Sequence, residues 1–409
     1  MRVLMAGARF SGLDGVSLEA EKVAEGLAAL GHEVVWLAGE LEPWHEGIEL
    51  PEMGLFTEEA RSLYDLAFGE EGEDPALEAA VEAAGARLHA GIEAALEGVS
   101  FDLLLVQNAW AIPMQLPLAV ALFRLWRGRG VPAIAHNHDY YWERPRFSKN
   151  RIPNVLERYF PPKGPVHLSI NHAAIRELKR RRGMESLYLP NVMPFERPLP
   201  PPDAFARGFR RAFGLEGKRI LLQPTRLVPR KQVEKSVELA ARLKARGHEV
   251  ALVVSHPGAD EGDAYPKRIQ ALARERGVPF YWIGERVGPR RDEKRGVYAL
   301  MDVYPNADLV TFPSRYEGFG NALLESVYAK KPLWVWPYPV YEEDIRPLGF
   351  RFFEPGAPIE QVEEALATPE ALAPDLEQNY RLAREHFGYR RLISVLEEAL
   401  REARAGTPL

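Results

Sequence analysis

Short apolar runs alternate along the chain with segments that place an apolar residue at every third or fourth position. Residues 2–7 form an apolar run that predicts a buried strand, and from Ser17 the spacing is that of one buried helix face. Gly31 is suited to end this helix, and residues 33–38 form the next strand-like run. The order strand, helix, strand predicts a βαβ unit at the start of the chain.

The same order of elements returns in the second half of the chain. A strand-like run covers 219–223, a helical pattern follows, and a further run covers 251–254. The tetrapeptide Gly-His-Glu-Val stands at the same point of both units, at 31–34 and at 247–250. Strands that alternate with helices need crossover connections and build parallel sheets. We therefore expect an α/β protein with two Rossmann-like domains.

Further runs extend both predicted sheets. In the first half the pattern predicts strands at 101–106, 131–135 and 187–191, and helices at 75–97 and 115–127. In the second half it predicts strands at 280–283, 309–312 and 333–336, a helix at 265–276, and two closing helices separated by Gly388. A proline-rich stretch at 194–202 is the best linker candidate. The expected domains are 1–195 and 196–380, followed by a C-terminal helical segment at 381–409.

Composition narrows the class of protein. A length of 409 residues favours two domains, and 46% hydrophobic with 27% charged residues is typical of a soluble globular protein. The net charge of -6 argues against a nucleic-acid partner. The chain has no cysteine, which excludes disulfides and thiolate metal sites. Its abundance of Arg, Glu, Pro and Ala would suit a thermophilic source.

The sequence also bears on location. The first apolar run is too short for a signal peptide, and no run approaches the ~20 apolar residues that cross a bilayer. We therefore expect a cytoplasmic protein without a transmembrane segment. The sequence does not exclude peripheral contact with a membrane.

One stretch combines a strand, a glycine-bearing turn and a helix. The apolar run 309–312 is followed by Pro-Ser-Arg-Tyr-Glu-Gly-Phe-Gly at 313–320, and a helix is expected from Asn321. Backbone N–H groups at a helix N-terminus stabilise a phosphate or a developing negative charge. Glu317 and Glu325 would lie ~10 Å apart at ~1.5 Å per residue, which suits a nucleotide-sugar. In the plainer interpretation both glutamates are merely solvated.

This stretch resembles the two-glutamate signature of glycosyltransferase family 4, with its Pro-Ser lead, Glu-Gly-Phe-Gly and a second Glu eight positions on. The resemblance implies a retaining enzyme with two Rossmann-like domains facing across a cleft, the GT-B type. It also implies that the last helix packs back on the first domain. The resemblance covers nearly the whole chain and is sharpest over 219–330. It weakens after 333–336, where family members often have Gly-Gly and this chain has Pro-Tyr-Pro.

The resemblance implies a set of donor-binding residues. Arg226 and Lys231, after the strand at 219–223, would neutralise the donor diphosphate, although a solvated basic loop is the alternative. Glu317 would contact the hexose and Glu325 the ribose. The remaining implied donor contacts are the amides of Gly318, Phe319, Gly320 and Asn321, and main-chain groups near Val287 that read the base. Thr225 replaces a common family glycine, so the backbone of this loop is expected to differ slightly.

The loop after the first strand contains Gly15, which would permit close approach of the backbone to a diphosphate. A plain turn explains this glycine equally well, because no GxGxxG pattern is present. Main-chain groups that recognise a base do not depend on a particular side chain and therefore leave little trace in a sequence. The base is therefore left open between uracil, guanine and adenine.

The loop after the strand at 131–135 contains His136, His138 and Asp139. By resemblance, His138 is the first-domain histidine that lies near the reacting anomeric carbon, and Asp139 would fix its ring. Because His136 and His138 are two positions apart, they would share one face of an extended segment and could bind a metal. A purely structural histidine is a third alternative. No other cluster supplies further ligands at a suggestive spacing.

The rest of that loop indicates an acceptor site. Trp142 could stack on a sugar or simply pack, and Arg144 and Arg146 belong to a local excess of positive charge. These residues suggest an acceptor that carries a carboxylate or phosphate, whereas an exposed basic face is the competing interpretation. Further candidates for the acceptor side, after the strand at 101–106, are Asn108, Trp110, Met114 and Gln115.

The functional prediction is a retaining glycosyltransferase that moves a hexosyl unit from a UDP-, GDP- or ADP-sugar to a hydroxyl acceptor. Catalysis is expected to be metal-independent and mainly electrostatic, with no cofactor. The alternatives are a nucleotide-sugar epimerase or phosphorylase on the same fold, and a nucleotide-sugar-binding protein without turnover. A metal-dependent hydrolase that uses the two histidines is a more remote one.

Overall fold

A computed structural model describes residues 1–258 and 262–406 of the chain. The chain divides into two compact units. Unit 1 comprises Met1–Pro190 and Arg390–Leu409, and unit 2 comprises Asn191–Tyr389. The chain therefore leaves unit 1 directly after a short strand at Leu187–Tyr188 and returns at the start of the last helix.

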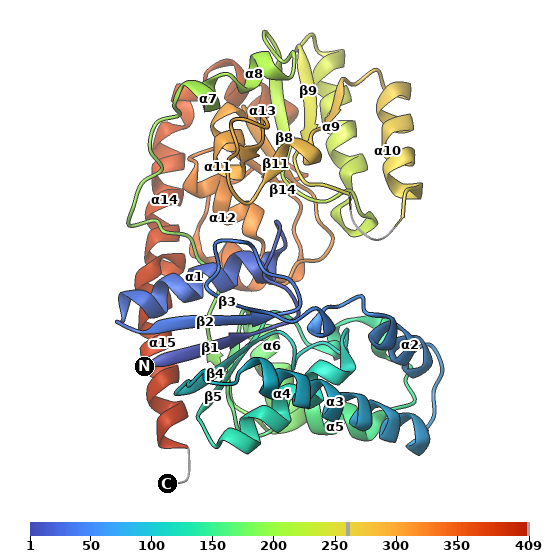
Figure 1. Ribbon diagram of the computed structural model, residues 1–409. Helices are drawn as coiled ribbons and strands as arrows, with labels where there is room; N and C mark the ends of the chain where they lie inside the picture. The colour runs from blue at the N-terminus through green and yellow to red at the C-terminus, as the bar shows by residue number, and fades with distance from the viewer. Residues whose placement is uncertain (259–261, 407–409) are drawn as a thin grey trace. The chain divides into compact units, whose positions relative to one another are not determined.

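Unit 1 contains a seven-stranded sheet in the order β3-β2-β1-β4-β5-β6-β7, and every neighbouring pair is parallel. Its strands are β1 (Arg2–Ala6), β2 (Glu33–Ala38), β3 (Gly47–Glu49), β4 (Leu103–Gln107), β5 (Ala133–Asn137), β6 (Val166–Ser169) and β7 (Leu187–Tyr188). Its helices are α1 (Gly15–Ala29), α2 (Glu58–Ala67), α3 (Pro75–Ala95), α4 (Leu116–Arg129), α5 (Pro153–Tyr159), α6 (His172–Arg182) and α15 (Tyr389–Ala405). Helix α1 lies on one face of the sheet, and α3, α4 and α5 lie on the other (Figure 1).

The central strands of unit 1 are apolar on both faces. All five residues of β4 are buried, and in β1 only Arg2 is partly exposed. A parallel sheet with helices on both faces buries both sides of its strands, which is why these strands appear in the sequence as continuous apolar runs. Leu4 and Leu104 belong to the core that α3 and α4 complete.

The last helix, α15, packs on α1 within unit 1. Its buried side chains form one stripe that includes Leu392 and Leu396. A Cβ at Gly26 of α1 would lie 2.8 Å from Leu396 Cδ1, so the missing side chain at Gly26 allows this close contact. The end of the chain thus completes the first unit, as the family resemblance implied.

Unit 2 contains a five-stranded parallel sheet in the order β10-β9-β8-β13-β14 and a two-stranded ladder of β11 and β12. Its strands are β8 (Arg219–Gln223), β9 (Val250–Val254), β10 (Phe280–Trp282), β11 (Val287–Gly288), β12 (Tyr298–Ala299), β13 (Leu309–Phe312) and β14 (Leu333–Val335). Its helices are α7 (Ala204–Arg207), α8 (Phe209–Ala212), α9 (Val233–Ala245), α10 (Ala264–Glu275), α11 (Leu300–Val303), α12 (Asn321–Tyr328), α13 (Ile359–Ala367) and α14 (Ala373–Phe387). Helices α9 and α10 lie on one face of the sheet, and α12 lies on the other (Figure 1).

The two parallel sheets confirm the predicted α/β class and its two Rossmann-like halves. The predicted helices at 75–97, 115–127 and 265–276 correspond to α3, α4 and α10. Strands β3 and β6 were missed, because neither forms an apolar run: β3 has one apolar side chain, Ile48, and His167 and Ser169 interrupt β6. No helix in the described part of the chain is both long enough and apolar enough to cross a bilayer.

Candidate active site

The candidate side chains Arg226, Lys231 and Glu317 lie in loops at the carboxyl ends of strands in unit 2. Strand β8 leads into a loop that ends in a helical turn at Pro229–Lys231, and β13 leads into the turn at 313–320. The two strands are neighbours in the sheet, with Leu309 opposite Leu221. Because ligands of open parallel sheets bind outside this edge, both loops are placed to contact one ligand.

Gly320 shapes the turn before α12. Its φ of 128° is one that L side chains rarely adopt, and a Cβ there would lie 2.3 Å from the Tyr338 hydroxyl. That hydroxyl donates a hydrogen bond of 2.5 Å to the Phe319 carbonyl. As the N-cap of α12, Gly320 has no side chain that could bond to the amides of the first helical turn. The start of α12 therefore has the local geometry suited to an anion.

Lys231 and Glu317 form an ion pair between the two loops. The Lys231 ammonium donates to Glu317 Oε1, and the Arg230 guanidinium lies 3.5 Å from Oε2. The Lys231 and Glu317 side chains are each only 11% exposed. Burial would raise the pKa of Glu317, but Lys231 and Arg230 hold it below its usual value. Burial lowers the pKa of Lys231 to about 8, against the opposing effect of Glu317, so both groups are charged at neutral pH.

A histidine that the sequence analysis did not single out adjoins this pair. Burial, together with the positive charges of Lys231 and Arg226, lowers the pKa of His256 to about 3, so its imidazole is neutral. A Cβ at Gly284 would lie 2.4 Å from the His256 carbonyl, which shows how closely the loops after β9 and β10 approach. The available signal for His256 was its position two residues after the strand β9.

The residues implied for the ribose and the base lie elsewhere in unit 2. Glu325 is buried on α12, and its Oε2 accepts a hydrogen bond of 2.7 Å from the Tyr304 hydroxyl. Val287 lies in β11, where it is paired with Tyr298 of β12. The ribose-binding role of Glu325 and the base-reading role of the main chain near Val287 stay predictions.

In unit 1, His138 is buried just beyond the carboxyl end of β5. Its Nε2 donates a hydrogen bond of 3.1 Å to Gln107 Oε1, and its amide donates to Asn108 Oδ1 at 2.8 Å. Asn108 Nδ2 in turn donates to Asp139 Oδ1 at 3.1 Å. The expectation that Asp139 fixes the imidazole is therefore wrong. Gln107 holds the ring, because the Asp139 carboxylate accepts from Asn108 and Arg144 instead.

The two histidines of this loop are neutral neighbours. Their ring centroids are 4.3 Å apart. Burial, followed by the charge of Lys22, lowers the pKa of His138 to about 3, and burial with His138 lowers that of His136 well below its usual value. Within residues 1–258 and 262–406, no group of three or more His, Cys, Asp or Glu side chains could hold a metal ion. The metal site considered for His136 and His138 thus has no third side chain beside it there.

The residues expected on the acceptor side differ in their surroundings. Trp142 stacks on Tyr140 with the ring centroids 4.7 Å apart and the planes 12° from parallel. The Arg146 guanidinium lies over the Phe147 ring, and Arg144 is paired with Asp139. The acceptor roles of Trp142, Arg144 and Arg146 stay predictions.

Trp110 contradicts the expectation that it lines the acceptor side. Its side chain is fully buried, and its Nε1 donates a hydrogen bond of 3.0 Å to the Ala119 carbonyl. An indole inside the core satisfies its N–H in this way, so Trp110 has a structural role.

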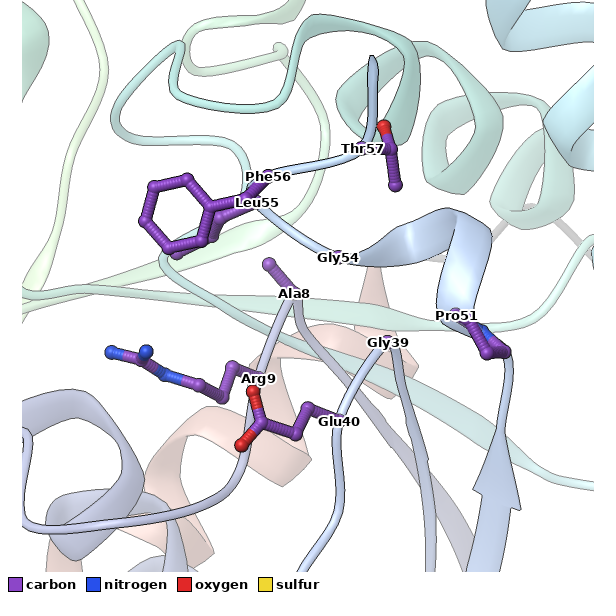
Figure 2. A pocket seen from close by; sticks show the side chains of 9 residues that line it. All are labelled: Ala8, Arg9, Gly39, Glu40, Pro51, Gly54, Leu55, Phe56 and Thr57. Atoms are coloured by element: carbon purple, nitrogen blue, oxygen red, sulfur yellow. The ribbon is translucent and has the colours of Figure 1, made fainter. Parts of the chain in front are cut away.

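Two adjoining cavities lie at the carboxyl edge of the sheet in unit 1. The first has a volume of about 240 Å³ and is lined by residues that include Arg9, after β1, and Glu40, after β2 (Figure 2). The second, of about 110 Å³, shares Ala8, Arg9 and Leu55 with the first. The other lining residues of this second cavity are Asp14, Val16, Gln107, Asn108, Ala109, Ile112, Met114, Gln115 and Leu118.

Three of the four residues expected after the strand at 101–106 thus line a cavity: Asn108, Met114 and Gln115. Arg9 was missed, although its position three residues after the end of β1 was a signal of the same kind. Gly15 is the first residue of α1, next to the N-cap Asp14 that lines this cavity. The diphosphate contact expected of Gly15 stays a prediction.

Two parallel α/β units, one of them with a basic loop paired to a glutamate at a helix start, are the arrangement of a GT-B glycosyltransferase. The profile of the family described as "Glycosyl transferases group 1" matches residues 207–376. Mannosylglucosylglycerate synthase of Thermotoga maritima is 30% identical over 439 residues, which cover 97% of this chain and 99% of that protein. Mannosylglucosylglycerate synthase of Petrotoga mobilis is 33% identical over 286 residues, 64% of this chain and 66% of that protein. The chain belongs to the group 1 glycosyl transferases and is a glycosyltransferase.

Solved structures agree with this fold. Sucrose-phosphate synthase of Thermosynechococcus elongatus superposes with a TM-score of 0.68 at 16% identity and covers 99% of this chain and 100% of its own. HepE of Anabaena, solved in complex with UDP-glucose, superposes with a TM-score of 0.64 at 14% identity and covers 98% and 100%. At these identities the likeness concerns the fold alone, and it confirms the predicted GT-B class.

Proposed function

We propose that the chain is a retaining mannosyltransferase that moves a mannosyl unit from a nucleoside-diphosphate sugar to a hydroxyl of glucosylglycerate. The product, mannosylglucosylglycerate, is the one named for two relatives, which cover 97% and 64% of this chain. The proposed donor is supported by one observation, the cluster of Lys231, Arg230 and Glu317 beside the start of α12.

The charges of this cluster suit a diphosphate. Lys231 and Arg230 pair with the single carboxylate of Glu317, and Arg226 lies near enough to Lys231 to lower its pKa. Three cations and one carboxylate leave two positive charges in excess. A nucleoside-diphosphate sugar carries two negative charges on its phosphates. As the glycosidic bond breaks, the departing diphosphate gains further negative charge. Cations that are fixed before the reaction stabilise this departure without any reorganisation. An ammonium has three N–H donors, so Lys231 can bind a phosphate oxygen while it remains paired with Glu317.

Metal independence rests on the same cations. In metal-dependent transferases a divalent ion offsets the charge of the leaving diphosphate, whereas here side chains would supply that charge. In the proposed reaction, the acceptor oxygen bonds to the anomeric carbon as the bond to the β-phosphate oxygen breaks. The nucleoside diphosphate leaves with the electron pair and takes up the hydroxyl proton on the same face, which retains the anomeric configuration.

The experiment is a matrix of donors and acceptors. Purified protein is incubated with GDP-mannose, UDP-glucose or ADP-glucose, each with glucosylglycerate, and release of nucleoside diphosphate is measured beside the product. We expect mannosylglucosylglycerate from a mannosyl donor, with an α linkage by NMR and with an unchanged rate after treatment with EDTA.

Each part of the proposal has its own contradicting result. A β linkage would exclude retention, and loss of the rate in EDTA that returns with Mg²⁺ would exclude metal independence. Conversion of the donor without any glycosylated product would indicate an epimerase or hydrolase instead.

A further inference from the structure

The cavity of about 240 Å³ in unit 1 lies between the loops that follow β1 and β2 and the segment 51–57 (Figure 2). Two charged side chains, Arg9 and Glu40, line it together with the apolar side chains of Leu55 and Phe56. Its volume corresponds to about eight water molecules at ~30 Å³ each, and the smaller cavity extends it. The space is therefore suited to a small polar molecule with an apolar face.

Arg9 is held loosely by its own protein. Its guanidinium lies 3.5 Å from Asp14 Oδ2, and its side chain is 30% exposed. Asp14 is already the N-cap of α1: its Oδ1 accepts from the amides of Val16 and Ser17 at 3.1 and 3.2 Å, and its Oδ2 accepts from the Ser17 hydroxyl at 2.6 Å. Asp14 would keep its own hydrogen bonds if Arg9 turned to another carboxylate. A guanidinium has five N–H donors in a planar fork, which matches a carboxylate with two parallel hydrogen bonds.

Glu40, which lines the same cavity, is negatively charged and accepts hydrogen bonds, whereas Arg9 donates them. Its Oε1 accepts a hydrogen bond of 2.6 Å from the Ser11 hydroxyl, which fixes the carboxylate at the cavity. An ionised carboxylate accepts several hydrogen bonds, so Glu40 can also accept from the hydroxyl groups of a sugar. Phe56, with 47% of its surface exposed and with the Arg61 guanidinium 5.3 Å from its ring centroid, adds an aromatic ring of the kind on which sugars stack.

A ligand that satisfies all three features has one carboxylate, several hydroxyl groups and an apolar ring face. We propose that this cavity binds the acceptor, with Arg9 recognising its carboxylate and Glu40 its sugar hydroxyls. The inference rests on the proposed function, which supplies glucosylglycerate as an acidic glycoside.

The position of the cavity agrees with this assignment. Gln107 and Asn108 line the smaller cavity that Arg9 shares, and both hold His138. A molecule anchored at Arg9 can therefore extend along the same unit toward the histidine assigned to the reacting carbon. Arg144, the earlier candidate for the acceptor anion, is instead paired with the buried Asp139.

The test compares an acidic and a neutral acceptor. Transfer to glucosylglycerate and to glucosylglycerol, which lacks the carboxylate, is measured for the wild type and the variants Arg9→Gln and Arg9→Lys. Arg124→Gln is the matched control, because it removes the same charge from the same unit at a residue that pairs with Glu82.

We expect Arg9→Gln to raise the KM for glucosylglycerate about ten- to a hundredfold, the loss typical of a hydrogen bond between charged groups. The KM for glucosylglycerol and the KM for the donor should stay within about twofold, and Arg9→Lys should restore part of the loss. An equal rise for both acceptors, or no rise for glucosylglycerate, would overturn the assignment. Thermal melting of each variant separates a folding defect from a binding defect.

Calorimetry distinguishes failure of this inference from failure of the proposed function. Glucosylglycerate is titrated into the wild type and into Arg9→Gln in the presence of nucleoside diphosphate. Binding that is lost in the variant supports the acceptor cavity even if no transfer occurs, and the proposed function alone would then be refuted. Absence of binding to the wild type, or equal binding to both proteins, would overturn the cavity assignment.

Discussion

Lys231 gives the sharpest test of the donor site, because its charge depends on pH in an accessible range. Burial, with smaller contributions from Arg230 and Arg226, lowers its pKa to about 8, although Glu317 acts in the opposite direction. A diphosphate binds the protonated form. The affinity for nucleoside diphosphate should therefore fall as the pH rises from 7 through 8.

The magnitude follows from the protonated fraction. A group with a pKa of about 8 is about one-tenth protonated at pH 9, so the apparent Kd should rise about tenfold between pH 7 and pH 9. Isothermal titration of GDP and UDP at pH 7, 8 and 9 measures this change directly. Lys231→Arg is the matched control, because a guanidinium stays protonated over the whole range and should give a nearly flat profile.

Two results would refute the reasoning. A flat profile in the wild type would mean that Lys231 keeps an ordinary pKa or makes no contact with the diphosphate. An equal decline in Lys231→Arg would assign the pH dependence to the nucleotide or to another side chain.

Two further substitutions test the loop before α12. Gly320→Ala should lower the free energy of unfolding by roughly 2–4 kcal/mol, from backbone strain and displacement of the Tyr338 hydroxyl, as measured by urea denaturation. Gly356→Ala, at a position with nothing within 4 Å of an added Cβ, is the control and should be nearly neutral; equal losses would contradict the strain argument. Glu317→Gln should lower kcat by about a hundredfold or more. It should also shift the decline in nucleotide affinity to lower pH, because Lys231 loses the partner that raises its pKa. Loss of nucleotide affinity at pH 7 equal to the loss of kcat would mean that the role of Glu317 is misassigned.

The fold could be predicted because the sequence patterns of most of its helices and strands extend over several residues. Helices such as α3 and α4 show their periodicity over many residues, and strands buried on both faces appear as continuous apolar runs. The repeated tetrapeptide at 31–34 and 247–250 marks the point where α1 and α9 each give way to the next strand. Strand β6 has no such signal, because His167 and Ser169 interrupt its apolar run.

The residue types of the donor loops could be named from the sequence, but their pairing could not. Lys231 and Glu317 are 86 residues apart and meet only because β8 and β13 are neighbours in the sheet. The same limit explains the error at Asp139. The sequence places Asp139 next to His138, whereas the structure turns its carboxylate to Asn108 and Arg144 and leaves the ring to Gln107.

The surroundings of His138 lead to a last prediction, about its protonation state. Burial and the nearby Lys22 lower its pKa to about 3, so the imidazole stays neutral over the whole physiological range. Because Gln107 Oε1 can only accept, the proton of the neutral ring lies on Nε2. His138 would then act on a substrate as a fixed dipole at Nδ1 and not as an acid that exchanges protons with solvent.

Nitrogen NMR of protein labelled with ¹⁵N-histidine measures both properties, and His138→Asn identifies the resonances. We expect the Nε2–H tautomer, with shifts that do not change between pH 5 and pH 8. Since the unfolded chain binds a proton at this position below its ordinary pKa of 6.5 and the folded chain does not, His138 should also lower the free energy of unfolding as the pH falls from 6.5 toward 3. That acid destabilisation should be smaller in His138→Asn. A titration midpoint near 6.5 would show that the ring is solvated, and the fixed-dipole role would then be wrong.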